Sequence, residues 1–189
     1  MALRPIVEMG RPILRAVAEP VANPHAAAIQ SLIDDMVETM LDAPGVGLAA
    51  PQIGVGLRVI VYRVPSSRQA VGEPPGPTEP VAILNPIITV LDPTEIIGRE
   101  GCLSIPGLLG QVPRAQRIGI EGVDRAGQPL QREATGFHAR VVQHEVDHLD
   151  GVLYIDRMRD LRSLAFERTL IQMAADPVTT PQTARGLES

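Results

Sequence analysis

The chain has 189 residues, of which 44% are hydrophobic and 2% aromatic, and its net charge at pH 7 is -5. This length and composition favour one domain with an aliphatic core. The negative charge and the scattered arginines argue against direct DNA binding. No run approaches the ~20 apolar residues of a membrane span. The single cysteine, Cys102, excludes an internal disulfide and favours a reducing compartment.

The N-terminal residues do not resemble a secretory signal, because Pro5, Glu8 and Gly10 interrupt any apolar stretch. Residues 4–15 contain three arginines, as an organellar transit peptide would. An amphipathic helix is nevertheless disfavoured there, because Pro12 adds a second break. We therefore expect a cytoplasmic protein, with organellar targeting left open.

An amphipathic helix is predicted between Asn23-Pro24 and Pro44-Gly45, because apolar residues from Ile29 to Met40 recur at spacings of three and four. The β-branched run at 57–62 predicts a buried strand. The stretch 65–80 is dense in Pro, Gly and Ser, which predicts a mobile surface loop.

The middle of the chain is predicted to form several short strands. Two of them, at 81–84 and 87–91, are expected to be separated by Asn85-Pro86. Two more, at 118–123 and 130–134, are expected to form a hairpin.

Two further helices are predicted, at 137–149 with Gly151 as its stop, and at 161–174. Because helices and strands are segregated along the chain, the fold class is α+β. We expect short, mostly antiparallel strands packed around the helix at 137–149, with an N-terminal and a C-terminal helix. Residues 1–175 would form one catalytic domain, followed by a flexible polar tail at 176–189.

Residues 143–148 read Gln-His-Glu-Val-Asp-His within the helix predicted at 137–149. In a helix of 3.6 residues per turn, His144 and His148 lie on one face, so both can bind one metal ion. Glu145 would stand beside them as a general base. This pattern is typical of a hydrolytic metal site, although a polar helix face can produce the same string by chance.

The identity of such a site depends on its third protein ligand. Tyr154 stands where metzincin proteases have their third histidine. Glu167, on the next predicted helix, could complete a thermolysin-like metalloprotease, which remains an alternative function. Cys102 could instead supply a thiolate. His138 lies about 120° around the helix from His144, so we expect it to face solvent or to cap the helix.

Three segments together resemble the peptide deformylases. Residues 45–52 read Gly-Val-Gly-Leu-Ala-Ala-Pro-Gln, residues 100–104 read Glu-Gly-Cys-Leu-Ser, and residues 143–148 complete the set. These match that family's motifs Gly-x-Gly-Leu-Ala-Ala-x-Gln, Glu-Gly-Cys-x-Ser and Gln-His-Glu-x-x-His in order and spacing. The similarity runs from residue 1 to about 174. One departure is Leu109, where many bacterial members have an arginine near the mouth of the substrate pocket.

The resemblance implies that Cys102, His144 and His148 hold one divalent metal ion. Fe²⁺ is the expected native ion, and Zn²⁺, Ni²⁺ or Co²⁺ could replace it. The ion would activate a water molecule for attack on a formyl carbon. Glu145 would take the proton of that water and pass it to the departing amine.

The resemblance also implies a substrate, the N-terminal formylmethionine of newly synthesised polypeptides, from which formate is released. The side-chain amide of Gln52 and the backbone N–H of Leu103 would stabilise the oxyanion. The peptide would bind as an added strand, and the enzyme would associate transiently with the ribosome. The predicted peptide-binding residues are Val46, Gly47, Gly101 and Val141.

Overall fold

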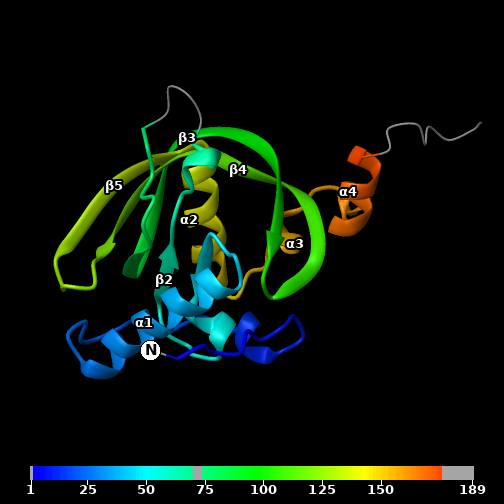
Figure 1. Ribbon diagram of the computed structural model, residues 1–189. Helices are drawn as coiled ribbons and strands as arrows, with labels where there is room; N and C mark the ends of the chain where they lie inside the picture. Colours follow the sequence, from blue (N-terminus) through cyan, green and yellow to red (C-terminus); the bar gives the residue numbers. More distant parts are fainter. Residues whose placement is uncertain (1, 70–73, 176–189) are drawn as a thin grey trace, which may run out of the picture.

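The computed structural model describes residues 2–69 and 74–175, which form an antiparallel sheet wrapped around one helix. The strand order is β1-β2-β3-β4-β5, and β6 pairs with β4. Figure 1 shows the helix α2 among the strands, with α1 below them. The strands are β1 (Gly47–Ala49), β2 (Val59–Tyr62), β3 (Val81–Cys102), β4 (Ile105–Val123), β5 (Pro129–Thr135) and β6 (Ala165–Phe166).

The expected α+β class and antiparallel pairing are confirmed, but the expectation of short strands is wrong for β3 and β4. These strands have 22 and 19 residues. The pair Asn85-Pro86 does not end β3 but produces a register shift, with Asn85 at φ 51°. Strand β2 pairs with β3 only up to Leu84, so Pro86 removes no hydrogen bond from that ladder.

The helices are α1 (Ala27–Asp42), α2 (Gly136–Leu149), α3 (Tyr154–Arg157) and α4 (Glu167–Ala175). The first two agree with the sequence-based expectation, but the third predicted helix begins only at Glu167. Residues 161–163 form a short 3-10 helix instead, for which the Asp160 carboxylate accepts the backbone N–H of Arg162. Residues 165–166 then pair with β4, which is incompatible with a helix starting at Leu161.

Helix α2 is buried over most of its length and packs against an aliphatic core shared with the sheet. The helix ends where predicted, because Gly151 adopts a left-handed conformation at φ 70°. A Cβ there would come within 2.6 Å of the Arg15 carbonyl oxygen. The backbone N–H of Ala18 also donates to the Leu149 carbonyl at 2.8 Å. The N-terminal segment therefore packs tightly against the end of α2.

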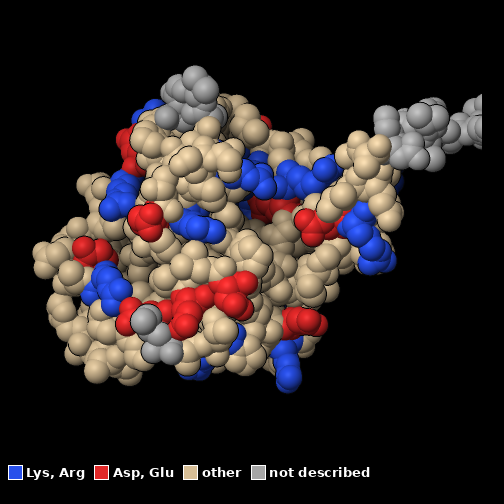
Figure 2. Space-filling model, viewed as in Figure 1, with Lys and Arg blue, Asp and Glu red and all other residues tan. Residues whose placement is uncertain are grey.

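Acidic side chains form a stripe over α1 in Figure 2. Asp42 contributes an exposed carboxylate and Asp34 a half-buried one to this helix, whereas Asp35 is buried and accepts the backbone N–H of Ala2. The described helices include none that is both long and apolar enough to cross a membrane.

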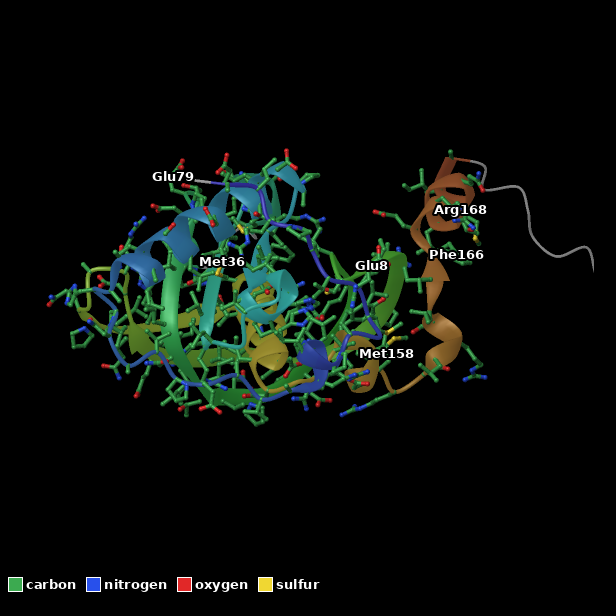
Figure 3. The ribbon with its side chains drawn as sticks, turned by 90° about the horizontal axis from the view of Figure 1, so that it is seen from below. Glu8, Met36, Glu79, Met158, Phe166 and Arg168 are labelled. Carbon is green, nitrogen blue, oxygen red and sulfur yellow. The ribbon has the colours of Figure 1, made fainter. Side chains whose placement is uncertain are left out.

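Residues 161–175, called here the C-terminal arm, extend from the edge of β4. Figure 3 shows Phe166 and Arg168 on this arm at one side of the molecule, where Phe166 pairs with Leu108 of β4. No residue of α4 is buried. The predicted loop at 65–80 contains a 3-10 helix at Ser66–Arg68, and its residues 70–73 lie outside the described part, as does the predicted tail at 176–189.

Candidate active site

The structure brings together the three predicted metal ligands. Cys102 ends β3, while His144 and His148 lie one turn apart on α2. Their ligand atoms all lie within 4.8 Å of one another, and the Cys102 Sγ is 3.2 Å from the His148 Nε2. Within the described residues this is the one group of three or more potential ligands of that size. The sequence prediction of a Cys-His-His cluster is therefore correct in its geometry.

The chemistry of this cluster fits a divalent metal ion. The Nδ1 of His144 is bonded to the Glu100 Oε2 at 2.9 Å, so its Nε2 remains for a metal, as in most histidine ligands. A thiolate with two imidazoles suits a tetrahedral site with one open position. In the described part of the chain, Glu145 Oε2 is also buried without a hydrogen-bond partner, as expected beside a position that takes a polar ligand.

The two imidazoles differ in basicity. For His144, burial disfavours the charged ring, but hydrogen bonds to Cys102 and Glu100 raise its pKa well above the usual value. For His148, burial and the neighbouring charge of His144 lower the pKa well below that value. Because a metal ligand must be unprotonated, binding of an ion would release a proton from His144.

Glu100 holds His144 through a buried network of charges. Although burial opposes ionisation, hydrogen bonds from His144 and Arg114 lower the pKa of Glu100 to about 2. Arg114 donates one hydrogen bond from Nε to Glu100 Oε1 at 2.9 Å and another from Nη2 to Glu100 Oε2 at 3.0 Å. Its Nη1 reaches Asp147 Oδ2 at 2.6 Å. Arg140 adds a second guanidinium, 2.7 Å from Glu100 Oε1.

Gln52 lies in the 3-10 helix Ala50–Ile53 with its amide in a fixed orientation. The backbone N–H of Ala49 donates to Gln52 Oε1 at 2.8 Å, so the amide nitrogen faces the other way. That nitrogen lies 3.2 Å from Ser104 Oγ and 3.4 Å from Cys102 Sγ. A hydrogen-bond donor is therefore held beside the metal cluster, as an oxyanion site requires.

Glu145 lies beside the cluster and directly under β1. A Cβ on Gly47 would lie 2.2 Å from Glu145 Oε1, so only glycine leaves room for the carboxylate at this position. Burial raises the pKa of Glu145 to about 7, a value suited to taking and returning a proton near neutral pH.

The predicted peptide-binding residues surround the same cluster. The Val46 carbonyl accepts the Arg63 N–H at 2.9 Å, so Val46 faces β2. By the alternation of an antiparallel pair, the backbone groups of Gly47 face the free edge of β1. Val141 lies one turn before His144 and is buried in the core.

Gly101 and Leu103 flank Cys102 on either side. Gly101 pairs with Leu109, and a Cβ on this glycine would lie 2.6 Å from the Leu109 side chain. Leu109 also pairs with Ala165 of β6. Leu103 occupies the turn between β3 and β4. The backbone next to Cys102 is therefore closely packed against Leu109 of β4, which in turn pairs with the C-terminal arm.

The expectation for His138 is wrong, and the alternative that uses Glu167 as a metal ligand is not supported. His138 neither faces solvent nor caps the helix, but is buried with its Nε2 3.2 Å from the Tyr62 hydroxyl. Glu167 is exposed at the start of α4 and does not belong to the metal cluster. The thermolysin-like alternative therefore lacks its ligand.

Sequence reasoning did not assign roles to the buried charges that support the cluster. Glu100 lies inside a recognised motif, two positions before Cys102, and Asp147 directly precedes His148. Both acids could therefore be recognised in the sequence, but the arginines that bind them come from other elements. Arg114 lies on β4 and Arg140 on α2.

The chain is similar to known proteins over most of its length. The family model described as polypeptide deformylase matches residues 3–163. The chain is 49% identical over 166 residues to peptide deformylase 1 of Bordetella pertussis, covering 87% of this chain and 93% of the relative.

Solved structures show the same likeness. Peptide deformylase from Thermotoga maritima superposes with a TM-score of 0.74 at 38% identity, covering 85% of this chain and all (100%) of the other. A class I type b peptide deformylase from Acinetobacter baumannii, bound to Met-Ala-Ser, has a TM-score of 0.75 at 37% identity. That likeness covers 83% of this chain and 99% of the other.

Proposed function

Because the chain belongs to the peptide deformylase family, we propose that Cys102, His144 and His148 are the ligands of its catalytic metal ion. The activity of the family is the hydrolysis of the N-formyl group of newly synthesised polypeptides, which releases formate. The observation that carries the ligand assignment is the convergence of one thiol and two imidazoles within 4.8 Å. Residues 1–175 would form the single catalytic domain.

The bound ion would lower the pKa of a water molecule and so supply a nucleophile near neutral pH. We propose Fe²⁺ as the native ion, with Zn²⁺, Ni²⁺ or Co²⁺ as possible replacements. The mixed set of one sulfur and two nitrogen donors suits all four ions, and none of them needs a carboxylate ligand.

Glu145 is proposed to move the proton. Its carboxylate is buried beside the cluster, and Oε2 has no hydrogen-bond partner among the described residues. A carboxylate with a pKa of about 7 can accept a proton from the attacking water and then donate it to the leaving amine. The absence of a side chain at Gly47 leaves room for this carboxylate beside the cluster.

Gln52 and Leu103 are proposed to stabilise the oxyanion that forms when the formyl carbon is attacked. The Gln52 amide is already oriented by Ala49 and Ser104, so little reorganisation is needed. Leu103 would contribute its backbone N–H from the residue next to Cys102.

We propose that the substrate peptide adds a strand to the free edge of β1, where Gly47 offers backbone groups. Gly101 and Val46 would frame the peptide backbone, and Val141 would form one wall of the pocket for the methionine side chain. The Met-Ala-Ser bound to the Acinetobacter baumannii relative supports a methionyl peptide as ligand. In the cell, the enzyme would act in the cytoplasm and associate transiently with the ribosome.

The experiment that tests these assignments combines metal analysis with product analysis. The protein is purified anaerobically with Fe²⁺, and formate release from formyl-Met-Ala-Ser is measured with the bound iron. We expect Cys102→Ser to lose both the iron and formate release, while Glu167→Ala keeps both. Retention of iron by Cys102→Ser, or cleavage of internal peptide bonds by the wild type, would contradict the proposal.

A further inference from the structure

Arg140 is a buried charge with an unusual set of partners. The residue is 9% exposed and projects from α2, four positions before the His144 ligand. Its Nη1 lies 2.8 Å from the Val112 carbonyl of β4, and its Nη2 lies 2.6 Å from the Ile96 carbonyl of β3. Nη1 also lies 2.7 Å from the carboxylate of Glu100. The guanidinium is thus fixed to two strands and to one acid.

Gly98 provides the space that this guanidinium fills. A Cβ on Gly98 would lie 2.8 Å from both Cζ and Nη2 of Arg140, closer than any side chain tolerates. The Gly98 carbonyl also accepts from Arg140 at 3.4 Å. Gly98 has no positive φ, so its backbone conformation does not require glycine. The close approach of Arg140 is therefore the reason for a glycine here.

The Glu100 carboxylate receives donors on both oxygens. Oε2 accepts from Arg114 and faces His144, while Oε1 accepts from Arg114 and Arg140. The two donors of Arg114 form a planar fork, and the third contact of that guanidinium is the side chain of Asp147 on α2. Arg140 is anchored to the backbone of the sheet, so it fixes the carboxylate relative to the strands.

We propose that Arg140, accommodated by Gly98, is a positioning residue that fixes Glu100 and thereby orients the His144 ring for metal binding. This inference rests on the proposed role of His144 as a metal ligand. Mutation of a residue that hydrogen-bonds to a metal ligand commonly weakens metal affinity about 10–100-fold. Arg140 acts through one intermediate residue, so the lower end of that range is expected.

The most specific test moves the guanidinium without removing its charge. In Gly98→Ala, the new methyl group displaces the flexible end of Arg140. We expect the dissociation constant of Co²⁺, measured by competition with a chelating dye, to rise about tenfold. The visible absorption of bound Co²⁺ should also change, because it reports ligand geometry.

Gly119→Ala is the matched control on β4. A Cβ at Gly119 would meet Leu91 at an ordinary distance of 3.7 Å, far from this network. We expect its Co²⁺ affinity and absorption spectrum to equal those of the wild type.

Arg140→Lys provides a second variant that also keeps the charge. Lysine cannot reproduce the several fixed donors of a guanidinium, so this variant should bind Co²⁺ more weakly than the wild type. Arg58→Met controls for stability, because Arg58 links the Asp150 carboxylate after α2 to the Pro86 carbonyl of β3 without touching Glu100. It should lower stability and leave Co²⁺ binding unchanged.

The outcomes separate this inference from the proposed function. If the wild type binds Co²⁺ but both Gly98→Ala and Arg140→Lys bind it with wild-type affinity and spectrum, Arg140 has no positioning role. If the wild type binds no Co²⁺, the ligand assignment itself fails, and the inference fails with it.

Discussion

The ion pairs around Glu100 and the ion pair at the start of the C-terminal arm are formed by the same residue types, but the former are buried and the latter is exposed. Arg114 and Glu100 each expose 5% of their side chains, whereas Arg162 and Asp160 expose 91% and 51%. Both pairs have hydrogen-bond distances near 2.9 Å. Distance alone therefore does not distinguish an ion pair that shapes the active site from one at the surface.

Burial decides what each pair contributes. A buried charge that loses its partner cannot recover water, so removing one partner is costly even where the intact pair adds little net stability. An exposed pair is screened by solvent, and its loss is compensated by hydration. The network behind His144 should therefore be sensitive to substitution, while the arm should tolerate it.

The largest effect is expected for Arg114→Met. This change leaves the buried carboxylates of Glu100 and Asp147 with fewer donors, and should lower the free energy of unfolding by ~3 kcal/mol. Urea unfolding of the metal-free protein measures it. Arg117→Met, on the same strand but half exposed, is the control and should cost less than ~1 kcal/mol. Equal effects of the two changes would remove the distinction drawn from burial.

A smaller effect is expected from His138, which is buried and whose hydrogen-bond partner among the described residues is the Tyr62 hydroxyl rather than a carboxylate. Burial, together with the charge of Arg132, lowers the pKa of His138 to about 4. The unfolded chain binds this proton below about pH 6.5, so the contribution of His138 to stability should fall as the pH is lowered, by ~2 kcal/mol from pH 7 to about pH 5. The pKa values of Glu145, His144 and His148 also change on folding, so urea unfolding of the wild type measures a sum, and a variant at position 138 isolates this contribution.

The matched variant for this prediction is His138→Gln, which cannot take up the proton. Relative to the wild type, the change in its unfolding free energy from pH 7 to about pH 5 should be less destabilising by ~2 kcal/mol. An unchanged difference in the variant would mean that other groups cause the pH dependence.

The smallest effect is expected for Arg162→Ala on the C-terminal arm. Its guanidinium contacts only Asp160 among the ion pairs of the described residues, and both side chains are exposed. The urea midpoint should not shift measurably. A shift as large as that of Arg114→Met would show that the arm is held to the body by this pair.

The metal cluster could be predicted because its chemistry is encoded in short motifs. The spacing of His144 and His148 alone puts both rings on one face of a helix, and the motif at 100–104 predicts that Cys102 joins them, as the structure shows. The ends of α1 and α2 were also predictable, because Pro44 and Gly151 act locally.

The supporting network could not be predicted, because its contacts depend on strand register and long-range packing. Arg114 and Glu100 are 14 residues apart, and Arg140 and Glu100 are 40 apart. These residues come together only because β3 and β4 form one long antiparallel ribbon. In the sequence, Asn85-Pro86 and the charged stretch near Glu95 suggested separate short strands instead. His138 was misplaced for a similar reason, since its partner Tyr62 comes from β2.

The most direct test of the central claim is formate release per bound metal ion by the wild type and by Glu145→Gln. Both proteins should bind one Fe²⁺ per chain, because Glu145 is beside the cluster rather than in it. With formyl-Met-Ala-Ser, the wild type should release formate, and the variant should be slower by at least ~100-fold, since it cannot transfer the proton. No release by an iron-loaded wild type, or equal rates for the two proteins, would contradict the account.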